Sequence, residues 1–225
     1  MNAADKLVAA IAAQNASSPG AAVSELRRLR RGFSRTLAAE PGRLVIAVAA
    51  SLSQVPRPGH RFIAYELIQK HPGAASAVGE RDLLRLGSGM DSWEAVDCFS
   101  IYLSGPAWLR GGIGDRVVHG WARSPDVWWR RAALVSTVPL NSRTHGGRGD
   151  PTRTLRVGRM LMDDREPMVV KSLSWALREL AKREPAAVRS FLGEYSGRLP
   201  ALVLREVRNK LETGLKNPRG GRAAR

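Results

Sequence analysis

Apolar residues recur every three to four positions along almost the whole chain. Leu26, Leu29, Phe33 and Leu37 show this spacing, which places them on one face of a helix. The alternation of polar and apolar residues that is typical of strands does not persist for more than a few residues. The pattern therefore predicts an all-α protein. Besides the helix that carries these four residues, we expect helices at about 3–14, 42–53, 58–70, 91–104, 113–123, 125–138, 151–163, 166–183, 185–195 and 199–215.

Several helix starts and stops have local signals of their own. Asp91 and Glu94 have the spacing of a capping box, and Ser124 stands where a cap would precede a first-turn proline, Pro125. Pro167 suits a first-turn position in the same way. Glycine and proline predict breaks at 56–59, 87–89, 105–106, 111–112 and 146–147. Short helices joined by short connections predict a row of helical hairpins.

Two-helix units of roughly 35 to 47 residues have the size of armadillo and HEAT-like repeats, in which each pair buries its apolar face against its neighbours. We therefore predict stacked helical hairpins that form a HEAT-like or armadillo-type solenoid, in a single domain over residues 1–217. No repeat is detectable in the sequence itself, so a compact helical bundle is the structural alternative. Residues 218–225 are rich in glycine and arginine and predict a mobile basic tail.

The charge balance narrows the class of partner. The 225 residues include 36 Lys and Arg against 20 Asp and Glu, which gives a formal net charge of +16. Such a surface attracts polyanions, and the helix carrying Arg27, Arg28, Arg30, Arg31 and Arg35 should be amphipathic and basic. The alternative is that arginine is frequent only because the genome is rich in GC. No stretch has the 18 to 20 apolar residues of a membrane span, and residues 1–14 do not resemble an export signal, so we expect a cytoplasmic protein.

The sequence offers few residues for metal or redox chemistry. Cys98 is the only cysteine, so no intramolecular disulfide can form, and we expect a buried structural thiol. The histidines show no spacing that would gather ligands on one helix face: His60, His71, His119 and His145. We therefore expect neither a metal site nor a cofactor.

The glycine-rich segment 144–150 is better explained as a connecting loop than as a phosphate-binding loop. It lacks the Lys and Ser or Thr of an NTPase loop, and it follows no predicted strand. Arg148, with Arg143 and Arg153, could contact backbone phosphates of a nucleic acid, and a solvated loop is the equal alternative.

Tryptophans beside charged residues are the strongest candidates for chemistry. Three of the six tryptophans lie one helical turn from a charge: Trp93 with Asp97, Trp128 with Arg131, and Trp175 with Lys171 and Arg178. An aromatic face can stack against sugars and bases, but core packing is the commoner role of any single tryptophan.

The segments that carry these residues, 92–97, 128–134 and 171–179, resemble the AlkD family of DNA alkylation-repair glycosylases in order and approximate spacing. The resemblance covers about residues 90–215. It implies an all-α arrangement of HEAT-like repeats with a concave basic face that holds double-stranded DNA carrying alkylated bases. We expect a monomer.

The resemblance also implies roles for individual residues. Asp97 matches the catalytic aspartate of the family, Trp93 and Trp175 match its two sugar-facing tryptophans, and Arg131 matches its DNA-contacting arginine. The implied reaction is hydrolytic excision of N3- or N7-alkylated purines. Such a base is already cationic, leaves as a neutral species and needs no general acid, so one carboxylate can suffice. Asp97 would stabilise the sugar oxocarbenium and orient water, and the indoles would add cation–π attraction.

The sequence departs from the family at two points. The usual N-terminal segment with an aromatic residue and a Gly-x-x-x-Pro turn is replaced by a dense basic helix over residues 27–39, and Glu94 stands where the family commonly has Asp. The first departure removes contacts expected to bracket the lesion. The family needs no deep base pocket, in contrast with most glycosylases, and the resemblance implies the same here. The alternatives to a glycosylase are a non-catalytic HEAT-like module that binds DNA or an acidic protein, and an interaction protein whose basic charge is incidental.

Overall fold

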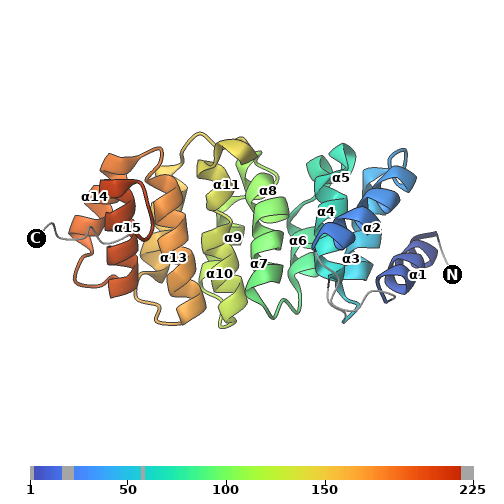
Figure 1. The fold of residues 1–225 in the computed structure, drawn as a ribbon, viewed down its shortest axis with the longest axis horizontal. Coiled ribbons are helices and arrows are strands. Elements are labelled where there is room, and N and C mark those ends of the chain that lie inside the picture. Colours follow the sequence, from blue (N-terminus) through green and yellow to red (C-terminus); the bar gives the residue numbers. More distant parts are fainter. Residues whose placement is uncertain (1–2, 17–22, 57–58, 219–225) are drawn as a thin grey trace, which may run out of the picture. The chain divides into compact units, whose positions relative to one another are not determined.

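The computed structural model describes residues 3–16, 23–56 and 59–218, and every regular element within these ranges is helical (Figure 1). The all-α prediction is confirmed. The helices group into two compact units, Met1–Val117 and Val118–Arg225, which we call unit 1 and unit 2 and describe separately. The single domain over 1–217 stays a prediction, and the expected tail lies outside the described residues apart from Pro218.

Unit 1 is a stack of short helices around α4. Its elements are α1 (Ala3–Ala16), α2 (Val23–Thr36), α3 (Gly42–Ser53), α4 (His60–Gln69), α5 (Pro72–Ala77), α6 (Glu80–Gly87), α7 (Trp93–Phe99), the π-helical η1 (Ser100–Ser104) and α8 (Gly105–Leu109). Helix α4 packs against α2, α3, α5 and α7, so most contacts join helices that are close in sequence. Leu52, Ile63 and Phe99 are fully buried in this core. This is the packing that stacked helical hairpins require.

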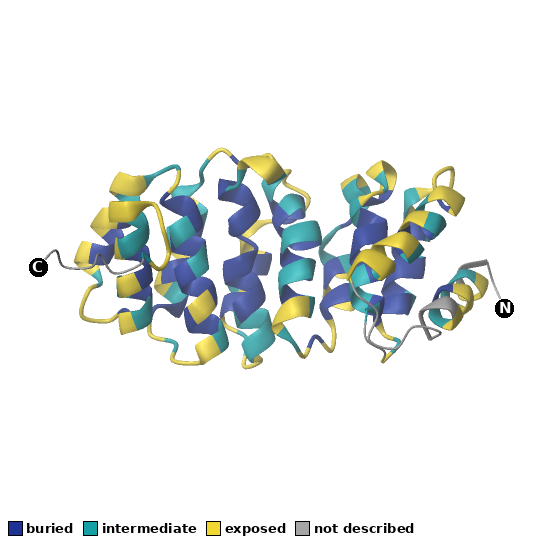
Figure 2. Ribbon diagram, in the orientation of Figure 1, coloured by how far each residue is buried: buried dark blue, intermediate teal, exposed yellow. Residues whose placement is uncertain are grey.

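Unit 2 is built around one long helix. Helix α9 (Asp115–Ala122) crosses the boundary, and the remaining elements are α10 (Val127–Val135), α11 (Val138–Asn141), the 3-10 turn η2 (Arg143–His145), α12 (Pro151–Leu161), α13 (Pro167–Leu180), α14 (Pro185–Glu194) and α15 (Ala201–Thr213). Helix α13 packs against α10, α12, α14 and α15. In both units the longer helices carry buried and exposed residues along their length, and the buried residues are concentrated in the interior of each unit (Figure 2). The predicted stacking of helical hairpins is thus confirmed within each unit.

Three local predictions at helix ends are wrong. The expected break at 105–106 is absent, because the π-helical turn η1 carries the chain directly from α7 into α8, and Pro106 takes a first-turn position that needs no N–H donor. Helix α7 is capped by Ser92 rather than by Asp91, and α10 is capped by Asp126 rather than by Ser124. The first-turn prediction for Pro167 is confirmed.

Candidate functional site

Trp93 and Asp97 lie together on helix α7 of unit 1. The Ser92 hydroxyl caps this helix by accepting a hydrogen bond from the backbone N–H of Ala95 at 3.3 Å. Val96 and Phe99 are buried in the core, which fixes the rotation of the helix and leaves Trp93 and Asp97, one turn apart, on another face. Trp93 keeps 50% of its surface exposed, so core packing does not explain this tryptophan, and Asp97 is half-buried.

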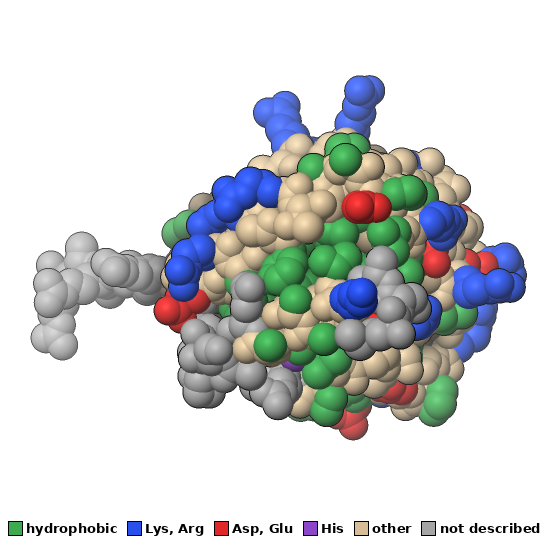
Figure 3. Space-filling model, turned by 90° about the vertical axis from the view of Figure 1, so that its right-hand side faces the viewer, with side chains coloured by type: hydrophobic (Ala, Val, Ile, Leu, Met, Phe, Trp, Pro, Cys, Tyr) green, Lys and Arg blue, Asp and Glu red, His purple; other side chains and the backbone are tan. Residues whose placement is uncertain are grey.

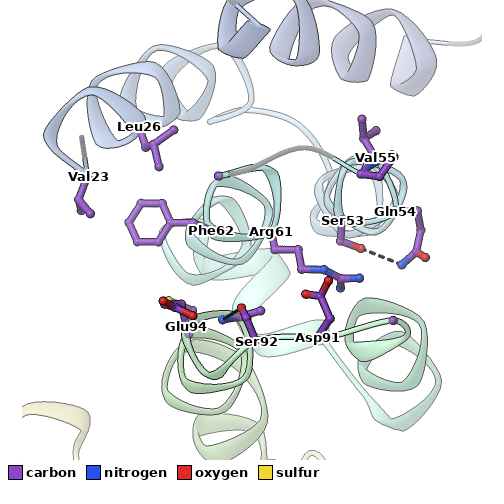
Figure 4. Close-up of a pocket in the computed structure, with 15 residues that line it drawn as sticks. Val23, Leu26, Ser53, Gln54, Val55, Arg61, Phe62, Asp91, Ser92 and Glu94 are labelled. Atoms are coloured by element: carbon purple, nitrogen blue, oxygen red, sulfur yellow. Dashed lines mark hydrogen bonds between the residues drawn. The ribbon is translucent and has the colours of Figure 1, made fainter. Parts of the chain in front are cut away.

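A pocket of about 600 Å³ lies beside α7, on a different side of the helix from Trp93 and Asp97, neither of which lines it (Figure 4). Glu94, Ala95 and Cys98 of α7 line one side of it, and residues of α2, α3 and α4 line the others. This pocket was not predictable from the sequence, because its walls come from several helices. The sequence pattern predicts only a capping role for Glu94.

Cys98, which was predicted to be a buried structural thiol, is partly buried. Burial raises the pKa of the Cys98 thiol to about 11, and the nearby negative charges of Asp97 and Glu66 act in the same direction. The thiol is therefore protonated near neutral pH, so Cys98 is a poor nucleophile and a poor metal ligand. Within the described residues no three His, Cys, Asp or Glu side chains come together to hold a metal ion.

Trp128 and Arg131 lie on helix α10 of unit 2. Asp126 caps this helix by accepting a hydrogen bond from the backbone N–H of Trp128 at 2.8 Å. The Arg131 side chain is buried, with 6% of the residue exposed, and one of its terminal nitrogens donates to the carbonyl oxygen of Met168 at 2.6 Å. Because Met168 belongs to the first turn of α13, this bond joins Arg131 to the helix that carries Lys171, Trp175 and Arg178.

Helix α13 presents Lys171, Trp175 and Arg178 at one-turn intervals. Leu173 and Leu177 are buried, Lys171 is exposed, and Trp175 and Arg178 are half-buried. The spacing predicted from the sequence is therefore realised on one continuous helix. It places a cation one turn to either side of Trp175.

Arg178 is engaged inside unit 2. It donates from its Nε to the Ser174 hydroxyl at 3.2 Å and forms an ion pair with Glu206 of α15 at 3.7 Å. The Ser174 hydroxyl in turn donates to Glu206 at 2.6 Å. Burial lowers the pKa of Arg178, and the negative charge of Glu206 opposes that shift. This network joins α13 to α15, so the contribution of Arg178 to a DNA surface is partly compensated by Glu206.

Arg148 lies in an ordered connecting loop between η2 and α12, and its side chain is exposed. Gly147 before it is buried, and a Cβ at that position would overlap the carbonyl of Pro139. The backbone N–H of Asp150 donates to the Asn141 side chain at 2.8 Å. The interpretation as a connecting loop is confirmed, and the loop holds Arg148 at the surface.

The candidates therefore divide between the two units, and Arg148 lies in a separate loop of unit 2. Trp93 and Asp97 share α7 in unit 1, whereas Trp128 and Arg131 of α10 join Lys171, Trp175 and Arg178 of α13 in unit 2. Convergence of the two groups on one concave basic face stays a prediction.

The profile of a family described as DNA alkylation repair enzyme matches residues 3–211. The chain belongs to this family. No curated protein matches it. Membership confirms the resemblance read from the three segments and extends it to the N-terminal helices, for which those segments offered no support. The chain is therefore a DNA alkylation repair protein of an enzyme family whose substrate is DNA. In the part of this repair protein that the structure describes, no helix is long and apolar enough to cross a membrane.

The arginines of helix α2 divide into two sets in this repair protein. Arg27 and Arg30 pair with the buried Glu66 of α4 at 3.2 and 3.0 Å. The second set forms no ion pair with any described residue and is exposed along one stripe: Arg28, Arg31 and Arg35. Figure 3, which views the N-terminal end of the molecule, shows Lys and Arg side chains spread over several parts of this face rather than gathered in one patch. Substitution of one exposed set of arginines at a time can therefore show which surface contacts DNA.

We expect replacement of Arg28, Arg31 and Arg35 together by alanine to weaken binding to alkylated and undamaged duplex DNA alike, since phosphate contacts carry no sequence information. Three lost contacts should reduce the slope of log affinity against log salt concentration by about 2 to 3. Fluorescence anisotropy over a salt series measures this slope. Arg81→Ala, an exposed arginine of α6, is the control. An unchanged slope in the triple variant would remove α2 from the DNA interface.

Proposed function

We propose that the protein is a monofunctional DNA glycosylase that hydrolyses the bond between deoxyribose and a cationic N3- or N7-alkylated purine in duplex DNA. The observation that carries the proposal is the pair of Trp93 and Asp97 on α7, in a chain whose family is that of DNA alkylation repair enzymes. The half-exposed indole of Trp93 and the carboxylate of Asp97 can both stabilise the positive charge that develops on the sugar.

The proposed reaction needs few catalytic groups besides Trp93 and Asp97. The alkylated base carries a positive charge and departs as a neutral molecule, so no acid is needed to protonate it. As the glycosidic bond stretches, the positive charge moves to the sugar, where the carboxylate of Asp97 stabilises it and orients the attacking water. The faces of Trp93 and Trp175 attract the same cation. The products are a free alkylpurine and an abasic site.

The remaining candidates serve to hold the duplex. In this proposal Arg131 anchors a phosphate beside the lesion, and Trp128, Lys171, Arg178 and Arg148 contact the DNA backbone or sugars. The proposal needs no cofactor and works in a monomer. The joint position of these residues on one concave basic face is part of what is proposed.

The test is release of free base from alkylated duplex DNA. We expect the purified protein to liberate 3-methyladenine or 7-methylguanine from methylated duplex DNA, measured by chromatography with mass detection, and to leave abasic sites that alkali cleaves. Undamaged duplex is the control substrate. Tight binding to the same DNA without base release or any other loss of the lesion would instead favour a non-catalytic HEAT-like DNA-binding module.

A further inference from the structure

The chain turns back on itself after helix α15 of unit 2. Gly214 ends this helix with a left-handed backbone, at a φ of 74°, and its carbonyl oxygen accepts a hydrogen bond from the Lys210 ammonium. The side-chain amide of Asn209 donates to the carbonyl oxygen of Lys216 at 3.1 Å. The residues that follow α15 therefore lie back along its last turns, as can be followed in Figure 1.

This turn places Lys216 beside the carboxylate that holds Arg178 of α13. The Lys216 ammonium lies 3.3 Å from one oxygen of Glu206, and the Arg178 Nε lies 3.7 Å from the other. One carboxylate thus serves two cations, so the three side chains together keep one positive charge. The Arg178 side chain is 19% exposed and that of Lys216 is 46% exposed. Lys216 is therefore the cation of this group that a phosphate reaches more easily.

The sequence continues the positive charge beyond Lys216. Arg219, Arg222 and Arg225 follow at intervals of three residues, and from Thr213 to Arg225 the sequence has no Asp or Glu. Runs of cations without acidic residues commonly act as arms that bind nucleic acid. Residues 219–225 lie outside the described ranges, and a stretch of that length spans at most about 25 Å. This reach exceeds the width of the major groove of duplex DNA, about 12 Å.

We propose that Lys216 and the three arginines after it, which we call the basic arm, contact the phosphates of duplex DNA and extend the surface of α13. The ion pair of Lys216 with Glu206 fixes the start of the basic arm next to Arg178, one turn from Trp175. The inference rests on the proposed contact of α13 with DNA. An acidic peptide also offers negative charge, but the family repairs DNA, and a duplex presents one phosphate charge for about every 1.7 Å of its axis.

The experiment compares the salt dependence of duplex binding between variants of the basic arm. Replacement of Arg219, Arg222 and Arg225 together by alanine should reduce the slope of log affinity against log salt concentration by about 2 to 3, and Lys216→Gln should reduce it by about 1. Fluorescence anisotropy with undamaged and alkylated duplexes measures both changes. Lysine at the same three arginine positions keeps the charge and should keep the slope. Arg208→Gln, which removes a cation from the exposed side of α15, should also leave the slope unchanged.

Footprinting tests the position of the basic arm. On a duplex with one abasic-site analogue, the triple alanine variant should lose protection from hydroxyl radicals at one edge of the footprint only, because the arm starts at one end of the α13 surface. Loss of protection at both edges would contradict this placement. Unchanged salt slopes in the triple alanine variant and in Lys216→Gln would overturn the basic arm. Binding of an acidic peptide by the arm, with those DNA slopes unchanged, would overturn it in favour of a protein partner.

Failure of this inference is separable from failure of the proposed function. The basic arm contacts phosphates and not the reacting sugar, so the triple alanine variant should release base from saturating alkylated duplex at the wild-type rate. A wild-type protein that releases no base would refute the glycosylase proposal without affecting the salt slopes on undamaged DNA. Normal base release together with unchanged slopes would refute the basic arm alone.

Discussion

The variant Asp97→Asn is expected to release alkylpurine from methylated DNA on the order of 10²–10³-fold more slowly than the wild-type protein, the usual cost of removing one electrostatic contact to a transition state. Asparagine keeps the size and planarity of the side chain and removes only the negative charge. In the proposed reaction that charge faces a positive sugar, and the neutral amide neither stabilises the cation nor polarises the attacking water. Single-turnover release of base measures the chemical step without product dissociation.

A DNA-binding measurement distinguishes loss of catalysis in Asp97→Asn from loss of DNA binding. Removal of a negative charge from a DNA-binding surface leaves affinity unchanged or raises it, so the variant should bind alkylated duplex at least as tightly as the wild type. Glu40→Gln removes an exposed carboxylate of unit 1 and should release base at the normal rate. Equal release by wild type and Asp97→Asn would take the catalytic role away from Asp97. Circular dichroism and thermal unfolding test whether both variants are folded.

The helices were predictable where one apolar stripe or one capping residue decides the structure. Helix α2 has the predicted amphipathic pattern, with Phe33 buried and Arg28, Arg31 and Arg35 exposed. The predicted helices include neither α5 nor α6. The six residues of α5 are too few to show a period, and the helix depends on the His71 ring, which accepts a hydrogen bond from the backbone N–H of Ala74 at 3.0 Å. Helix α6 does have an apolar stripe, with Leu83 and Leu86 fully buried, so its absence from the prediction is an error of interpretation rather than a lack of signal. The break predicted at Pro106 is wrong because the π-helical turn before it, which accommodates the proline ring, has no sequence signature.

Pairs of candidate residues on one helix were predictable from the sequence. How residues on different helices come together was not. The spacing of Trp93 and Asp97 fixes them on one face of a helix, whereas the exposure of that face depends on which other residues, here Val96 and Phe99, reach the core. The ion pair of Arg178 with Glu206 and the pocket beside Glu94 join positions tens of residues apart. Contacts of that kind depend on how helices dock, which a periodic pattern does not encode.

Among the ion pairs of unit 1, those of Glu66 should contribute most to stability. Its side chain is 4% exposed, and both of its oxygens receive guanidinium nitrogens from α2, Arg30 at 3.0 Å and Arg27 at 3.2 Å. Arg30 is itself buried, and Arg27 also stands over the ring of Phe62 at 5.6 Å. The three side chains therefore hold α2 against α4, the two helices that supply Leu26 and Phe62 to the pocket.

Glu66→Ala should lower the free energy of unfolding by about 3–5 kcal/mol, because removal of one partner leaves the Arg30 guanidinium buried without its counter-charge. Urea unfolding followed by circular dichroism measures the loss. The matched control is Glu80→Ala, which breaks the pair with Arg116 on the surface, where the two side chains are 40% and 82% exposed, and should cost about 0–1 kcal/mol. If the two variants lost the same small amount, the buried pair would not hold α2 in place.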